Sequence, residues 1–125
     1  MHIAGIIESS NTQSILDTIK YFLNNENKKV SFSEYSYFKN RETWNDYCLA
    51  IEQTGTEILI IKIKNSDVDE ALYFIPFDTL IINDYNEWKI VSNIIHTNKK
   101  SFKNLTVILN SDVIKTAKFT DEEIC

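Results

Sequence analysis

Small polar residues follow the first apolar run of the chain, where they would form a turn suited to binding an anion. The segment GIIESSNTQS (residues 5–14) passes from this run into a stretch of helical spacing. Backbone N–H groups at the start of a helix bind phosphate well, because the helix dipole adds positive potential there. The candidate nucleotide-binding residues of this segment are Ser9, Asn11, Thr12, Gln13 and Ser14.

The same segment lacks the residues of a Walker-type phosphate loop. Such a loop uses glycines to bring its backbone close to the phosphates, followed by a lysine and then Ser or Thr. Here the loop interior contains no glycine, Thr12 occupies the lysine position, and Glu8 would repel phosphate. Helix capping by Ser9 and Asn11 also explains these polar residues, and it does so without a ligand. Capping and anion binding are therefore both open, with capping favoured.

Acidic and amide side chains also follow two later apolar runs. Asp84 and Glu87 come after one run, and Asn110 and Asp112 come after the next. In a parallel sheet these strand ends share an edge with the first turn, so the carboxylates would converge with Glu8. Convergence would suit a divalent cation, although acids at strand ends also cap helices. No ligand spacing links these residues, and we expect no resident metal.

The elements that position these side chains are predicted by short β-branched runs alternating with stretches of helical period. The expected strands cover residues 3–7, 30–33, 57–64, 79–83 and 105–110. The expected helices cover residues 14–23, 42–53, 67–74 and 87–96. Long segments between strands favour crossover connections and a mainly parallel sheet. We therefore expect one three-layer α/β domain over residues 1–125, with helices on both faces, as in P-loop and Rossmann-like folds.

The overall composition excludes several classes of partner. The chain has 125 residues with 13 basic and 18 acidic side chains, a net charge of -5, which argues against broad capture of nucleic acid or anionic membrane. No window approaches the length of apolar sequence that a membrane span requires. Cys48 and Cys125 have no paired spacing, which fits a reducing, cytoplasmic setting.

Aromatic residues alternate with polar ones in the segment FSEYSYF (residues 32–38). Alternation of this kind extends a strand into the core or forms an exposed patch for another protein. No cluster of arginines accompanies the segment, which argues against nucleic-acid binding. Core packing is the favoured interpretation, and self-association or binding of a protein partner is the alternative.

The order of several segments resembles the central, ATP-binding domain of the Mur ligases and the folylpolyglutamate synthetases. Residues 3–23 are similar to that family's first strand, GTNGKTT loop and first helix, with Gly5 just before the loop. The segment FDTLIINDYNEW (residues 77–88) resembles a later family motif. It places Asn83 on the motif's asparagine and Glu87 on its aspartate.

A third segment, NLTVILNSDV (residues 104–113), resembles the strand whose end contacts the nucleotide in that family. The resemblance implies an α/β fold with ATP and Mg²⁺ as cofactors, and it assigns Asn110 and Asp112 to the nucleotide site. The family's functional residues are replaced elsewhere, since Thr12 stands at the lysine and Trp88 at the histidine. The family's substrate-recognition and carboxyl-terminal domains have no room in this chain.

These replacements predict a noncatalytic Mur-ligase-like domain that acts as a binding or assembly module. ATP-driven ligation needs a lysine and a metal to neutralise phosphate charge, so we expect no ligase activity and no cofactor. One alternative is a nucleotide- or anion-binding domain with a divergent phosphate loop, which would use ATP and Mg²⁺. Another is a receiver- or flavodoxin-like signalling module, which Lys64 and Asn65 disfavour because they stand where a phosphoacceptor aspartate is needed.

Overall fold

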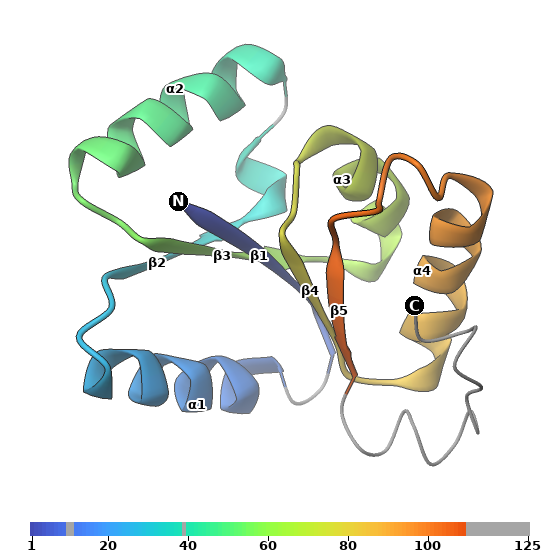
Figure 1. The fold of residues 1–125 in the computed structure, drawn as a ribbon, viewed down its shortest axis with the longest axis horizontal. Helices are drawn as coiled ribbons and strands as arrows, with labels where there is room; N and C mark the ends of the chain where they lie inside the picture. Colours follow the sequence, from blue (N-terminus) through green and yellow to red (C-terminus); the bar gives the residue numbers. More distant parts are fainter. Residues whose placement is uncertain (10–11, 39, 110–125) are drawn as a thin grey trace.

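The computed structural model describes residues 1–9, 12–38 and 40–109, and these contain a five-stranded sheet. The strands are β1 (His2–Ile7), β2 (Val30–Glu34), β3 (Ile58–Ile63), β4 (Thr79–Ile82) and β5 (Thr106–Leu109). Their order across the sheet is β2-β3-β1-β4-β5, and every neighbouring pair is parallel (Figure 1). The predicted three-layer α/β architecture is confirmed.

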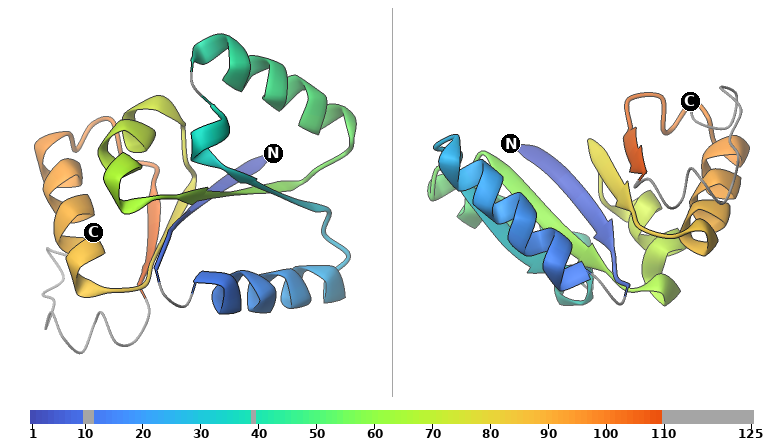
Figure 2. Two further views of the ribbon diagram at one scale, coloured as in Figure 1. Left: turned by 180° about the vertical axis from the view of Figure 1, so that it is seen from behind. Right: turned by 90° about the horizontal axis from the view of Figure 1, so that it is seen from below.

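Helices connect the strands and cover both faces of the sheet. They are α1 (Thr12–Asn25), α2 (Arg41–Gln53), α3 (Val68–Phe74) and α4 (Tyr85–Thr97). Two short 3-10 helices, η1 (Tyr35–Tyr37) and η2 (Asn65–Asp67), precede α2 and α3. Helix α1 lies on one face, and α2, α3 and α4 lie on the other (Figures 1 and 2). Right-handed crossovers explain this division, because the step from β1 to β2 runs opposite to every later step across the sheet.

Local side-chain and backbone chemistry sets several helix ends. Asn40 begins α2 by accepting a 2.8 Å hydrogen bond from the backbone N–H of Thr43. Asp84 begins α4 in the same way, accepting from the backbone N–H of Glu87 at 2.9 Å. Gly55 follows α2 with φ of 79°, a conformation that glycine adopts without strain. Across the described ranges, no helix combines the length and the apolar character needed to cross a bilayer.

The hydrophobic core has one part on each face of the sheet. The larger part lies against α2, α3 and α4 and includes Trp44 and Val91. The smaller part, Ala4, Ile6 and Ile60, lies beneath α1, whose own apolar side chains are only partly buried there. Helix α1 is therefore held by less apolar contact than the three helices on the opposite face.

Candidate functional site

The carboxyl end of β1 is where a parallel α/β sheet of this topology is expected to bind a ligand. Strand β1 continues into a helix on one face, while its neighbours β3 and β4 continue into helices on the other. The connections therefore diverge at this edge, which is the place where open parallel sheets usually bind ligands. Ser9, Thr12 and Asn83 of the predicted site lie at this edge. Three further predicted residues, Asn11, Asn110 and Asp112, lie outside the described residues.

The turn after β1 is closed by hydrogen bonds between Ser9 and Thr12. The backbone N–H of Ser9 donates to the Thr12 hydroxyl, and the backbone N–H of Thr12 donates to the carbonyl of Ser9 at 3.2 Å. The two hydroxyl oxygens lie 3.3 Å apart. This pattern resembles the returning arm of a capping box, in which a side chain in the first helical turn satisfies an earlier N–H. Thr12 is only 4% exposed, so its hydroxyl serves the turn itself.

Gln13 and Ser14 belong to the first turn of α1, which begins at Thr12 and not at Ser14 as predicted. The side chain of Gln13 donates to the carboxylate of Asp17 at 3.0 Å. The carbonyl of Ser14 accepts a 3.0 Å hydrogen bond from the hydroxyl of Thr18. Both contacts join residues four apart along the helix, and the side-chain pair of Gln13 and Asp17 stabilises its first two turns.

Two side-chain amides bind the end of β1 to its neighbouring strands. Asn83, directly after β4, is 6% exposed and donates from Nδ2 to the carbonyl of Ile7 at 3.4 Å. Asn65, after β3, donates from Nδ2 to the carbonyl of Glu8 at 3.3 Å. Asn83 therefore lies beside the end of β1. In both contacts the amide satisfies a backbone carbonyl just beyond the ladder, a structural use of the side chain.

Glu87 is the unusual group at this edge, because it is an acid that is only 2% exposed. Its Oε1 accepts a 3.2 Å hydrogen bond from the backbone N–H of Asn83. Its Oε2 is buried and has no hydrogen-bond partner among the described residues. Burial, together with the nearby carboxylate of Asp84, raises the pKa of Glu87 to about 8. The side chain is therefore largely a neutral carboxylic acid at neutral pH.

The sequence predicted that Glu87 lies at the carboxyl edge of the sheet, and it did not predict that the side chain is buried. The spacing of Asp84 and Glu87 is that of a capping box, a signal in the sequence for the start of α4. In the described part of the chain no three His, Cys, Asp or Glu side chains are placed to hold a metal, and Asp112, one of the carboxylates expected to converge here, lies outside it. Asp84 accepts from the N–H of Glu87, and Glu8 meets Asn65 through its backbone.

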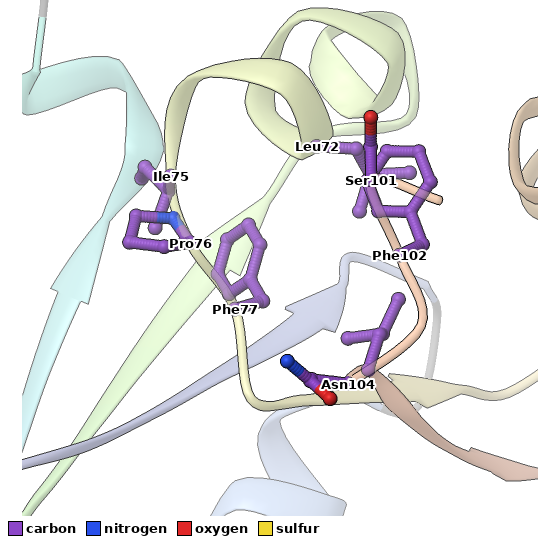
Figure 3. A pocket seen from close by; sticks show the side chains of 8 residues that line it. Leu72, Ile75, Pro76, Phe77, Ser101, Phe102 and Asn104 are labelled. Carbon is purple, nitrogen blue, oxygen red and sulfur yellow. The ribbon is translucent and has the colours of Figure 1, made fainter. Parts of the chain in front are cut away.

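A small cavity lies at the opposite, amino-terminal edge of the sheet (Figure 3). Its volume is about 80 Å³, and it is bounded by Leu72, Ile75, Pro76, Phe77, Ser101, Phe102, Asn104 and Leu105. Ligand pockets typically measure roughly 300–1,000 Å³ and carry several convergent polar groups. This mostly apolar space is a packing gap beneath the loop that leads into β5.

The aromatic segment at residues 32–38 divides between core and surface. Tyr35 and Phe38 are buried, at 4% and 3% exposed, which confirms core packing for these two. Phe32 and Tyr37 remain 39% and 62% exposed. Two shallow cavities of about 190 and 260 Å³ lie beside α1, and both are lined by Leu16 and Phe32. The segment therefore contributes to an open surface along β2 as well as to the core.

No protein-family model, curated protein or solved structure matches this chain significantly. The carboxyl edge of the sheet combines a closed turn, two structural amides and one buried acid. Functional interpretation therefore depends on the chemistry of these groups.

Proposed function

We propose that this chain is a noncatalytic α/β domain that acts as a binding or assembly module for a protein partner or a second copy. Its resemblance to the central domain of the Mur ligases suggests descent from an ATP-dependent ligase domain whose activity has been lost. The observation that carries the proposal is the closed turn after β1. We also propose a cytoplasmic setting, which fits two cysteines without paired spacing.

The chemistry of the turn opposes phosphate binding. Ligases that use ATP hold its phosphates with backbone N–H groups, a lysine and a metal ion. Here Thr12 stands at the lysine position and accepts the N–H of Ser9, so a phosphate would have to break the turn to reach that donor. The segment where the family has an acidic magnesium ligand reads IKIK (residues 61–64), and Lys62 pairs with Glu34 at 2.9 Å.

We expect the wild-type protein to give no saturable binding of ATP or ADP in calorimetric titrations, with or without Mg²⁺. A Thr12→Ala variant removes the hydroxyl that accepts from the N–H of Ser9, and it tests whether the closed turn is what excludes phosphate. Binding by this variant but not by the wild type would support the proposal directly. Saturable, magnesium-dependent binding by the wild type would overturn it and favour a nucleotide-binding domain with a divergent loop.

Removing the Thr12 hydroxyl is expected to destabilise the fold. A Thr12→Val variant removes the hydrogen bond from the N–H of Ser9 to the Thr12 hydroxyl, which should lower the free energy of unfolding by about 1–2 kcal/mol. A Thr12→Ser variant keeps the hydroxyl and should stay within about 0.5 kcal/mol of the wild type. Urea unfolding followed by tryptophan fluorescence measures both. A loss of stability in Thr12→Ser with none in Thr12→Val would show that the methyl group matters and the hydroxyl does not.

A further inference from the structure

Strand β2 forms one edge of the sheet and pairs only with β3 among the described residues (Figure 1). The N–H of Ile58 donates to the carbonyl of Lys29 at 3.2 Å, and Val30 lies in register with Ile58. In a parallel ladder this arrangement directs the backbone groups of Ser31 and Ser33 toward β3. The N–H and C=O groups of the alternate residues Val30, Phe32 and Glu34 therefore point away from the sheet.

The side chains of this edge leave an apolar surface beside it. Phe32 lies on the α1 side of the sheet in register with Ile60, which belongs to the core beneath α1. Its ring is 39% exposed, with the ammonium of Lys20 5.9 Å from the ring centroid. The two shallow cavities lined by Leu16 and Phe32 continue this surface along α1. An open strand edge beside an exposed aromatic ring is a site for adding another strand.

We propose that two copies of this chain pair antiparallel along β2, about a two-fold axis that passes beside Phe32. In this register the outward backbone groups of Phe32 bond to those of the partner's Phe32. The outward backbone groups of Val30 in each copy bond to those of Glu34 in the other copy. Every outward N–H and C=O group of the strand is then paired. This inference rests on the proposed assembly role and identifies a second copy as the partner.

Charge selects the second copy and its direction. The basic pair Lys28 and Lys29 precedes the strand, and Glu34 ends it. Antiparallel pairing brings Lys28 of each copy diagonally beside the partner's Glu34, within reach of long side chains. Parallel pairing would instead set like charges together at both ends. Glu34 also bonds to Lys62, which holds the pKa of its carboxyl below the usual value and keeps it ionised for this contact.

The interface would bring the two exposed Phe32 rings together on the α1 side. Aromatic pairs across antiparallel strands stabilise the pairing in addition to its backbone bonds. The strand has only five residues, so we expect a concentration-dependent dimer and not a permanent one. Its dissociation constant should rise with salt, because the Lys28 and Glu34 contacts are exposed to solvent.

Sedimentation velocity over a range of protein concentrations tests the pairing. The wild type should form a dimer, and Phe32→Glu, which sets two carboxylates beside the axis, should raise the dissociation constant at least about tenfold. Tyr21→Glu is the matched control, since Tyr21 is also an exposed aromatic residue, at 66%, and belongs to α1 and not to β2. A wild type that stays monomeric, or a dimer that Phe32→Glu leaves unchanged, would overturn the inference.

A charge exchange between two variants tests the register. Lys28→Glu and Glu34→Lys should each weaken self-association, because every copy then meets a like charge on its partner. An equimolar mixture should recover the dimer, since Glu34 of one variant then lies beside Lys28 of the other, and the two substituted positions also carry opposite charges. Loss without recovery on mixing would contradict the antiparallel register. The nucleotide titration separates the two proposals: a monomer that binds no ATP contradicts only this inference, whereas ATP binding contradicts the proposed function.

Discussion

Replacing Glu87 with glutamine is expected to remove a loss of stability that should develop in the wild type as the pH rises from about 4.5 to about 8. In this window the folded protein keeps a proton on Glu87 that the unfolded chain has already released. Stability must therefore fall with rising pH, by up to about 1.4 kcal/mol per pH unit. Below the window both states hold the proton, and above it both have lost it, so the contribution of this group becomes flat.

The burial of Glu87 is the reason for this sign. An ionised carboxylate at 2% exposure would leave Oε2 charged and without a hydrogen bond, next to the acidic side chain of Asp84. Protonation avoids both costs while Oε1 still accepts from the N–H of Asn83. Glutamine keeps the oxygen acceptor and the shape of the side chain, and it does not titrate.

Urea unfolding at a series of pH values between 5 and 9 measures this effect. The slope of unfolding free energy against pH should be shallower in Glu87→Gln than in the wild type, with the largest gain in stability at the alkaline end. Glu42→Gln is the matched control, because Glu42 is also in the first turn of a helix but is exposed. Parallel curves for the wild type and Glu87→Gln would show that the folded protein does not hold this proton.

The architecture was predictable because a single sequence shows the spacing of apolar residues and the polar or glycine residues that separate strands from helices. The run at residues 58–63 is buried almost continuously, as in a central parallel strand. The helices were predictable because their apolar residues recur at helical spacing. The strand order was not predictable in the same way. The order of the strands depends on how the connecting helices pack against the sheet, and the local sequence pattern carries no information about that packing.

The candidate site was predicted only in part, and the errors have physical causes. Thr12 looked like a loop residue because threonine is a weak helix former, yet its hydroxyl closes the turn and the helix begins there. Glu87 looked exposed because acids usually are, and its burial comes from the packing of α4 near the ends of β1 and β4. Strand β2 ends at Glu34, one residue beyond the predicted range 30–33, and η1 begins at Tyr35, so the aromatic alternation at residues 32–38 does not continue as a strand.

Replacing Gly5 with alanine is expected to lower the free energy of unfolding by about 1–3 kcal/mol, because β1 has no space for a methyl group there. A Cβ atom at Gly5 would lie 2.9 Å from Cε1 of Phe77, 3.0 Å from Cδ1 of Leu80 and 3.1 Å from Cδ1 of Ile63. Such distances require the surrounding core to move. The resemblance to the Mur ligases associates this glycine with a phosphate loop, whereas packing alone accounts for it here.

A double-mutant cycle with Phe77→Leu tests this packing explanation. Replacing the ring with the smaller leucine side chain should relieve the closest contact. The loss of stability in the double variant should therefore be smaller than the sum of the losses in the two single variants, by about 0.5 kcal/mol or more. Gly55→Ala is the control, since its Cβ would meet nothing within 4 Å and its cost arises from a φ of 79°. Phe77→Leu should leave that cost unchanged. Additive losses for Gly5→Ala and Phe77→Leu would instead indicate that the glycine is needed for its backbone and not for close packing against Phe77.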